Sequence, residues 1–216
     1  MDSPTGRIDV ISDVICPWCY IGKRQLEIAL PMLADQGLGF EVHWQPYQLN
    51  PDMPADGIDR AAYRLAKFGS AERTRAIDAR VAEAGAAVGL DIRHDRMTRT
   101  PNTVSAHRVV WFAEQHGVQG PVVEALFRGY FTEGRDIGDP DELAAIAEGA
   151  GLPGVGAMLA SAAGGETVLA QDMMARRAGI DGVPSFVMKN HVLFSGAVPG
   201  AQMADAFSRA WTMLSA

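Results

Sequence analysis

The sequence of 216 residues predicts an α/β fold that is interrupted by a large helical segment. Strand and helix patterns alternate at both ends of the chain, whereas residues 57–165 carry helix signals and no strand signal. Hydrophobic residues make up 48% of the chain and charged residues 21%, which is enough apolar mass for a substantial core. The length is short for two full-sized domains. We therefore predict one α/β domain, residues 1–56 plus 166–216, that carries residues 57–165 as a helical insertion domain.

The opening segment predicts a strand, a helix and a second strand. Residues 7–14 place apolar side chains among polar ones, which is typical of a short strand. From Trp18 onward, apolar residues recur at spacings of three and four, the pattern of an amphipathic helix. Residues 40–44 alternate between apolar and polar side chains and predict the second strand. The first helix is therefore expected to begin directly after the first strand.

Several sequence signals for the start of a helix lie in or next to the predicted insertion. Asn102 is expected to cap a helix that runs to about His116. Asp139 begins a capping box in front of Pro140, and proline suits the first position of a helix. A further helix is predicted near residues 166–178. The insertion is therefore predicted to be all-helical.

The end of the chain predicts two short strands and a last helix. The strands are expected at 183–188 and 192–194, on either side of a turn at 189–191. An amphipathic helix is predicted over about 200–214. The complete order is therefore strand, helix, strand, helices, strand, strand, helix.

The charge balance argues against nucleic acid and membrane partners. Lysine and arginine number 19 against 26 aspartates and glutamates, and the resulting net charge of −7 repels phosphate backbones and anionic lipid surfaces. The first six residues lack the basic stretch and apolar run of a signal peptide, and no long apolar run follows. We therefore expect the protein in the cytoplasm, where paired cysteines are more often catalytic or metal-binding than structural.

Both cysteines of the chain lie in one motif, Cys16-Pro17-Trp18-Cys19. With Pro17 in the first helical position, Cys16 becomes the N-cap and Cys19 falls in the first turn. The unpaired amides and the positive dipole end of the helix favour the thiolate of Cys16, which is the reactive form. We assign Cys16 the attack on a substrate disulfide. Cys19, which faces the core and is expected to keep the higher pKa, would resolve the mixed disulfide.

Two other uses of the cysteine pair are disfavoured. A zinc site needs two more ligands, and the five histidines show no HxxxH spacing. A structural disulfide at this spacing would close a loop too small to stabilise the fold through chain entropy. No metal or bound organic cofactor is therefore expected. The basic side chains of Lys23 and Arg24, further along the same helix, are expected mainly to face solvent.

The segments 12–27 (SDVICPWCYIGKRQLE) and 178–187 (AGIDGVPSFV) closely resemble DsbA-family oxidoreductases of the FrnE-like, cytosolic subgroup, and the resemblance spans the whole chain. It implies a thioredoxin fold with a large all-helical insertion, and a thiol–disulfide oxidoreductase or protein disulfide isomerase activity. It also implies a cis Val183–Pro184 bond opposite the cysteines, where the backbone of Val183 pairs with a substrate chain in β fashion. The expected partners are protein or small-molecule thiols and disulfides, with glutathione as a co-substrate and a second copy of the chain in a homodimer.

Three further residues are candidates for a place around the cysteines. Residues 100–108 also resemble this family, whose insertion helix begins there and leans over the active site. Within this segment, His107 is either a proton shuttle or a hydrogen-bonded core histidine, which its helical face favours, and Asn102 is explained as a helix cap. Thioredoxin carries a buried acid six positions before its first cysteine, but the matching residue here is Val10. Asp13 is the nearest acid and is expected to be structural or to lie just behind the cysteines.

Two rival functions remain open. The chain resembles more distantly the 2-hydroxychromene-2-carboxylate isomerases and kappa-class glutathione transferases, which use glutathione on small molecules. Those enzymes typically carry serine where Cys16 stands and lack the second cysteine. They also hold glutathione with a Ser-Asp pair near the last strand, where this chain reads FSGAV at 194–198. The second rival is a redox switch that changes shape without turning over a substrate. Because both cysteines are present, we predict a dithiol–disulfide oxidoreductase or isomerase.

Overall fold

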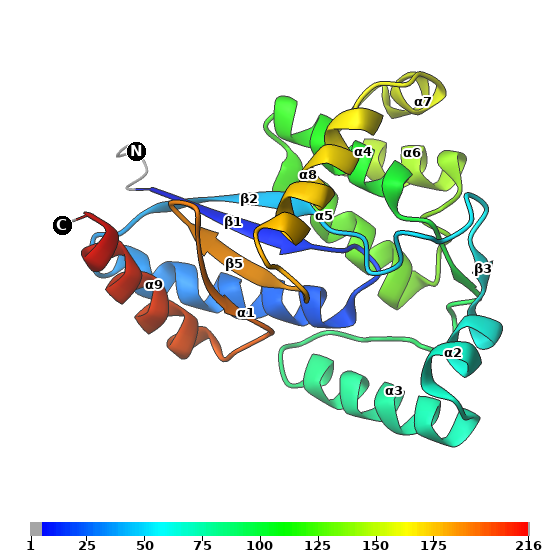
Figure 1. The fold of residues 1–216 in the computed structure, drawn as a ribbon, viewed down its shortest axis with the longest axis horizontal. Helices are drawn as coiled ribbons and strands as arrows, with labels where there is room; N and C mark the ends of the chain where they lie inside the picture. The colour runs from blue at the N-terminus through cyan, green and yellow to red at the C-terminus, as the bar shows by residue number, and fades with distance from the viewer. Residues whose placement is uncertain (1–5, 216) are drawn as a thin grey trace.

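A four-stranded sheet lies at the centre of the computed structural model, which describes residues 6–215 (Figure 1). Its strands are β1 (Gly6–Ser12), β2 (Phe40–Pro46), β5 (Ser185–Met188) and β6 (His191–Ser195). Their order is β2-β1-β5-β6, with β1 parallel to β2 and antiparallel to β5, and with β5 antiparallel to β6. Both ends of the chain thus contribute to one sheet, which confirms the predicted α/β class. Residues 1–5, on which the expectation of no signal peptide partly rests, lie outside the described residues.

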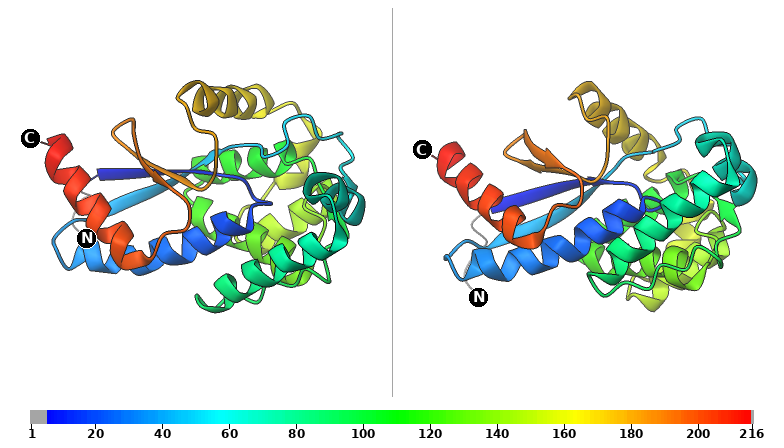
Figure 2. Two further views of the ribbon diagram at one scale, coloured as in Figure 1. Left: turned by 60° about the horizontal axis from the view of Figure 1, so that its bottom comes forward. Right: turned by 90° about the horizontal axis from the view of Figure 1, so that it is seen from below.

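Helices cover both faces of this sheet (Figure 2). On one face, α1 (Pro17–Ala34) packs beside α9 (Gly200–Ser215), and α8 (Gly165–Arg177) lies over the other face. A Cβ atom at Gly200 would stand 2.7 Å from the Cβ of Ile28 in α1. The two helices can therefore approach closely because Gly200 has no side chain. Within residues 6–215, no helix combines the length and the apolar character that crossing a bilayer requires.

The residues between β2 and α8 form a block of helices beside the sheet. They are α2 (Arg60–Phe68), α3 (Ala71–Ala86), α4 (Val104–Gln115), α5 (Gln119–Arg128), the π-helical turn η1 (Gly129–Glu133), α6 (Pro140–Gly149) and α7 (Val155–Ala160). The sequence shows no strand signal in this segment, but β3 (Ile58–Asp59) pairs antiparallel with β4 (Arg99–Thr100). Each of these strands has two residues, which is too short for an alternating pattern to emerge.

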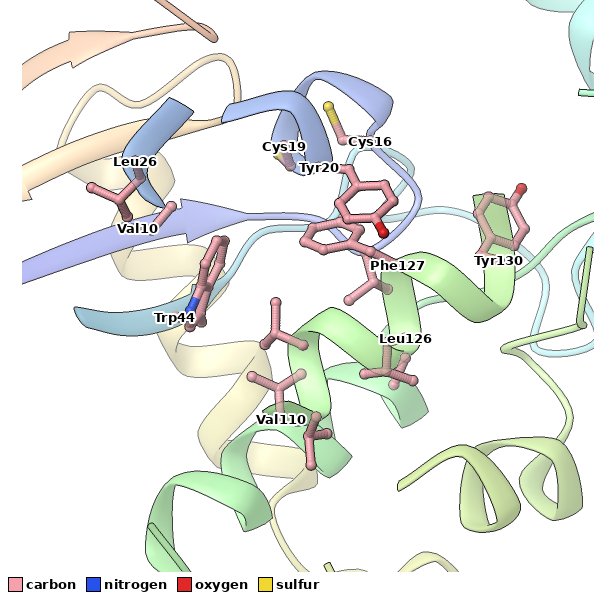
Figure 3. Close-up of a cluster of buried hydrophobic side chains, with 14 of the residues drawn as sticks. Val10, Cys16, Cys19, Tyr20, Leu26, Trp44, Val110, Leu126, Phe127 and Tyr130 are labelled. Carbon is pink, nitrogen blue, oxygen red and sulfur yellow. The ribbon is translucent and has the colours of Figure 1, made fainter. Parts of the chain in front are cut away.

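The sheet and the helical block share one continuous apolar core (Figure 3). Tyr20 of α1 stacks on Phe127 of α5, with 5.0 Å between the ring centroids, and on Phe131 of η1 at 6.0 Å. Trp44 of β2 meets the ring of Phe127 edge-on at 6.2 Å. All four side chains are buried. Since apolar packing runs without a break from the sheet to the helices, the boundaries of the two predicted domains remain predictions.

A partly buried ion network fastens α1 to α5. Lys23 Nζ lies 2.6 Å from one carboxylate oxygen of Glu124, while Arg24 pairs with the other oxygen, to which the Tyr20 hydroxyl donates at 2.9 Å. Burial alone would raise the pKa of Glu124, but the hydrogen bond and charge of Lys23, together with the charge of Arg24, lower it. Lys23 is buried, so the expectation that it faces solvent is wrong. Lys23 also pairs with Glu27 of its own helix, but the second partner, Glu124, lies far along the chain and could not be predicted from the local sequence.

Two predicted helix starts are confirmed with adjustments. The Asp139 carboxylate accepts hydrogen bonds from the second and third amides of α6, at 2.8 and 3.1 Å. The Glu142 side chain does not close the capping box, because it binds an arginine instead. At the start of α4, Asn102 Oδ1 accepts from the amide of Val104 at 3.0 Å, although the N-cap position itself belongs to Thr103. Both starts therefore use the predicted side chain to satisfy free amides.

Candidate active site

Cys16 and Cys19 lie at the start of α1, just after the chain leaves β1 (Figure 3). Cys16 is the N-cap with extended backbone angles, φ −91° and ψ 112°, and Pro17 occupies the first helical position, as predicted. The two thiols lie 3.5 Å apart, and both are free. Cys16 is 4% exposed and Cys19 is 0% exposed. Both cysteines are therefore buried, and of the pair only Cys16 keeps any exposed surface.

The loop that carries Val183 and Pro184 faces these cysteines. The Val183–Pro184 bond is cis, as the resemblance implies. The Cys16 thiol donates to the carbonyl oxygen of Val183, with 3.6 Å between sulfur and oxygen. Pro184 is buried, and Pro17, Trp18 and Val183 are half-buried. Folding thus brings together two segments that lie at opposite ends of the sequence.

Burial controls the protonation of Cys19. It raises the pKa of the Cys19 thiol well above its usual value, and the neighbouring sulfur of Cys16 acts in the same direction. The neighbouring Ser12 hydroxyl and the backbone of Asp13 act in the opposite direction but are outweighed. Cys19 therefore holds its proton at neutral pH, as expected for the resolving cysteine. The part played by Ser12 escaped the sequence analysis, because a single serine in a strand has no distinctive pattern.

Asp13 and His107 form a buried pair behind the redox motif. Asp13 is 0% exposed, and His107 Nε2 lies 3.3 Å from its Oδ1, at ion-pair distance but without hydrogen-bond alignment. Asp13 Oδ2 accepts from the amide of Leu49 at 2.7 Å, and its backbone carbonyl accepts from the amide of Cys16 at 3.0 Å. Asp13 therefore connects the redox loop to the segment after β2 and to α4.

Asn102 performs a different task. Its Oδ1 caps α4, and its Nδ2 donates to the carbonyl of Met53 at 2.8 Å. Both polar ends of the side chain are thus used to join the start of α4 to the loop that follows β2. This geometry favours the helix-cap explanation of Asn102.

The groups with metal-binding chemistry near the motif contact other protein atoms. Asp13 and His107 lie against each other, and Cys16 donates to Val183. Across the part of the chain that the structure describes, no three or more His, Cys, Asp or Glu side chains are grouped to hold a metal ion.

Gly22 stands where α1 passes the loop of Pro184. A Cβ atom at Gly22 would lie 2.9 Å from Cγ of Pro184, closer than real Cβ contacts. A proline ring cannot rotate out of the way, so the loop closes on α1 only because residue 22 lacks a side chain. This role of Gly22 was not predicted from the sequence. One feature of the sequence could have indicated it, namely a glycine inside a predicted helix. A glycine at such a position lowers helix stability by about 1 kcal/mol relative to alanine, so its presence often marks close packing.

We expect Gly22→Ala to slow thiol–disulfide exchange by about ten- to a hundredfold, because the added methyl group displaces Pro184 relative to Cys16. The rate of reaction with glutathione disulfide measures this effect. Gly120→Ala is the matched control, since a methyl group there meets nothing within 4 Å and should leave the rate unchanged. An unchanged rate in Gly22→Ala would mean that the position of the proline loop does not limit the reaction.

Comparison with known proteins shows a family match and relatives that share most of the chain's length. The family described as DSBA-like thioredoxin domain matches residues 7–210. The chain is 32% identical to a probable DsbA oxidoreductase from Streptomyces coelicolor, covering 96% of this chain and 90% of that one with a TM-score of 0.86. It is 28% identical to the uncharacterized protein YwbO of Bacillus subtilis, over 95% of this chain and 96% of that protein.

Two more distant solved structures share the fold. A 2-hydroxychromene-2-carboxylate isomerase has a TM-score of 0.68 and 14% identity, over 97% of this chain and 98% of that one. The cytosolic disulfide reductase DsbM from Pseudomonas aeruginosa, solved with GSH, has a TM-score of 0.60 and 17% identity, over 97% of this chain and 100% of that one. At these identities, the likeness establishes the thioredoxin-like fold alone.

Proposed function

Because the chain belongs to the DsbA-like thioredoxin domain family of oxidoreductases that act on thiols, we propose that it is a dithiol–disulfide oxidoreductase working through Cys16 and Cys19. One observation carries the proposal. Two free thiols lie 3.5 Å apart at the N-terminus of α1, one on a cysteine that keeps some exposed surface and the other fully buried with a raised pKa. This asymmetry suits a division into an attacking and a resolving sulfur.

The proposed reaction has two exchange steps. The Cys16 thiolate attacks one sulfur of a substrate disulfide, the substrate S–S bond breaks, and the other substrate sulfur leaves as a thiolate. Cys19 then loses its proton and attacks the Cys16 sulfur, which releases the second substrate thiol and leaves a Cys16–Cys19 disulfide. Two electrons thereby pass from the protein to the substrate, and an external thiol such as glutathione restores the dithiol. Since burial keeps Cys19 protonated, the second step should accelerate as the pH rises.

The loop of Val183 would hold the substrate. In the reduced protein, the Val183 carbonyl accepts a hydrogen bond from the Cys16 thiol. Once that proton is lost, the carbonyl can accept a backbone N–H from an extended substrate, in the manner of an added strand. Asp13 would act as a positioning residue, since its backbone and side chain tie the redox loop to α4.

The cytoplasm is the proposed compartment. The DsbM reductase that shares this fold is described as cytosolic and was solved with GSH, which supports glutathione as the reductant here. The chemistry itself requires no metal and no bound organic cofactor. A homodimer remains a prediction from the family resemblance.

A glutathione-dependent small-molecule isomerase is the second candidate, favoured by the fold shared with 2-hydroxychromene-2-carboxylate isomerase. The cysteine pair argues against it, because an enzyme that only activates glutathione has no use for a resolving thiol. A redox switch without turnover is the third candidate.

The test is to equilibrate the protein in glutathione redox buffers and to assay insulin reduction, refolding of scrambled ribonuclease and isomerisation of a hydroxychromene carboxylate. Insulin reduction supports the oxidoreductase, and ribonuclease refolding adds isomerase activity. Isomerisation of the chromene by a protein inert toward disulfides would replace the proposal with the second candidate. If the cysteine pair is oxidised and reduced but the protein turns over none of these substrates, the result would favour the third candidate, the redox switch.

A further inference from the structure

The insertion contains a pocket of about 560 Å³ between α2, α3 and the loop before β4. Its polar lining is mostly cationic or donating, and includes Arg60, Arg64, Thr74, Arg75 and His94. Neither cysteine lines it. We propose that this pocket binds the oxyanion head of a small amphipathic organic anion.

Arg60 lacks a carboxylate partner within residues 6–215. One of its guanidinium nitrogens donates to the Tyr130 hydroxyl at 3.2 Å, and the other donates to Nδ1 of His94 at 3.3 Å. Both acceptors are neutral groups when His94 is uncharged. Arg60 therefore lines the pocket without a direct ion pair among the described residues.

The contact with Arg60 determines the tautomer of His94. A guanidinium nitrogen can only donate, so Nδ1 is the acceptor and the neutral imidazole carries its proton on Nε2. Burial lowers the pKa of His94; the charge of Asp78 opposes this effect, and the charges of Arg60 and Arg64 act in the same direction as burial. His94 is therefore neutral near pH 7. Its Nε2–H is buried and has no hydrogen-bond acceptor among the described residues.

Arg64 and Thr74 add two more buried donors without acceptors. One terminal nitrogen of Arg64 pairs with Asp78, but Nε is buried and finds no partner among residues 6–215. The Thr74 hydroxyl, which also lines the pocket, is buried and unpartnered in the same part of the chain. A buried donor lowers stability unless something accepts its hydrogen. All three donors belong to side chains that line the pocket, and an oxyanion offers several acceptor atoms.

The balance of charge around the pocket also favours an anion. Asp78 pairs with Arg64 and also lies 3.5 Å from Nδ1 of His94, and Asp59 caps α2 by accepting from the amide of Ala62 at 2.8 Å. Arg75 is exposed at the rim and makes no hydrogen bond or ion pair with the described residues. Two arginine charges, on Arg60 and Arg75, are thus available in a chain whose net charge is −7.

The apolar residues that line the pocket favour a ligand with an apolar portion. Ala61, Leu65 and Met97 line the pocket, and Leu65 is 55% exposed. An exposed leucine beside unpaired arginines suits a ligand with a charged head and an apolar body. A carboxylate and a phosphate monoester share this chemistry, and an aromatic ring supplies the apolar part.

Calorimetric titration of the wild-type protein with benzoate, phenyl phosphate and benzyl alcohol tests the proposal. Both anions, or the one whose geometry fits, should bind in a saturable 1:1 manner, and the neutral alcohol should not. Arg60→Gln should weaken binding by about tenfold or more. Arg75→Gln, an exposed change that should not disturb folding, should weaken binding by about threefold.

Arg80→Gln is the matched control, because Arg80 is exposed on α3 but does not line the pocket. It should leave binding unchanged. Saturable binding of neither anion, equal binding of the alcohol, or equal weakening by Arg75→Gln and Arg80→Gln would overturn the proposal. Cys16→Ser should bind the anions as the wild type does, so the result does not depend on the proposed redox function.

Discussion

Cys16→Ser is expected to reduce thiol–disulfide exchange to the uncatalysed background. The substitution removes the sulfur of the one cysteine of the pair that keeps any exposed surface, and the fully buried Cys19 thiol cannot replace it. A serine hydroxyl is not ionised near neutral pH and does not form the covalent intermediate. The rate of insulin reduction with glutathione as the final reductant measures the loss.

Cys19→Ser is the matched comparison at the other end of the same motif. It keeps the attacking sulfur and removes the resolving one, so the mixed disulfide between Cys16 and the substrate should persist. Mass spectrometry of the protein after exposure to glutathione disulfide should show a single glutathione adduct on Cys16. Full exchange activity in Cys16→Ser, or an adduct on Cys19 in the wild type, would reverse the assignment of the two sulfurs.

Asp13→Ala is expected to lower the free energy of unfolding by about 3–5 kcal/mol, because it leaves the buried His107 side chain and the part-buried amide of Leu49 without their partner. In a chain of this size, that loss corresponds to a fall in melting temperature of roughly 10 °C. Thermal and denaturant unfolding, followed by circular dichroism, measure the change.

Two controls separate the causes of that loss. Asp13→Asn keeps an oxygen that can accept from Leu49 and removes only the charge facing His107, so it should cost less than the alanine variant. Asp9→Ala changes an aspartate of β1 that pairs with Arg7 at the surface, and should cost about 0–1 kcal/mol. Equal stability of Asp13→Ala and Asp9→Ala would show that the buried pair contributes nothing to folding.

Much of the fold could be predicted because the relevant signals are local. Periods of two and of three to four residues identified the strands and the helices around them, since each element must bury one face. The β3–β4 pair was missed because two residues cannot display a period. The burial of Lys23 was missed because it depends on Glu124, which comes from another helix.

The candidate active site likewise has features that the local sequence predicts and features that depend on contacts between distant segments. The N-cap position of Cys16 follows from the proline after it, and the structure confirms it. The cis bond before Pro184 was implied only by the family resemblance. The local sequence around Asp13 and around His107 does not show that the two side chains lie close together, because the end of β1 and α4 meet only after the chain folds.

The sequence by itself determined that this protein carries a cysteine pair at the start of a helix, because the spacing and the proline act over a single turn. Only the tertiary structure decided what surrounds that pair: the carbonyl of Val183 on Cys16, the glycine that lets Pro184 approach, and the buried Asp13–His107 contact. Only the tertiary structure, likewise, brought three side chains with unpartnered donors to one pocket of the insertion. The physical reason is that these features are contacts between distant segments, whose formation depends on how the whole core packs and not on any local preference of the chain.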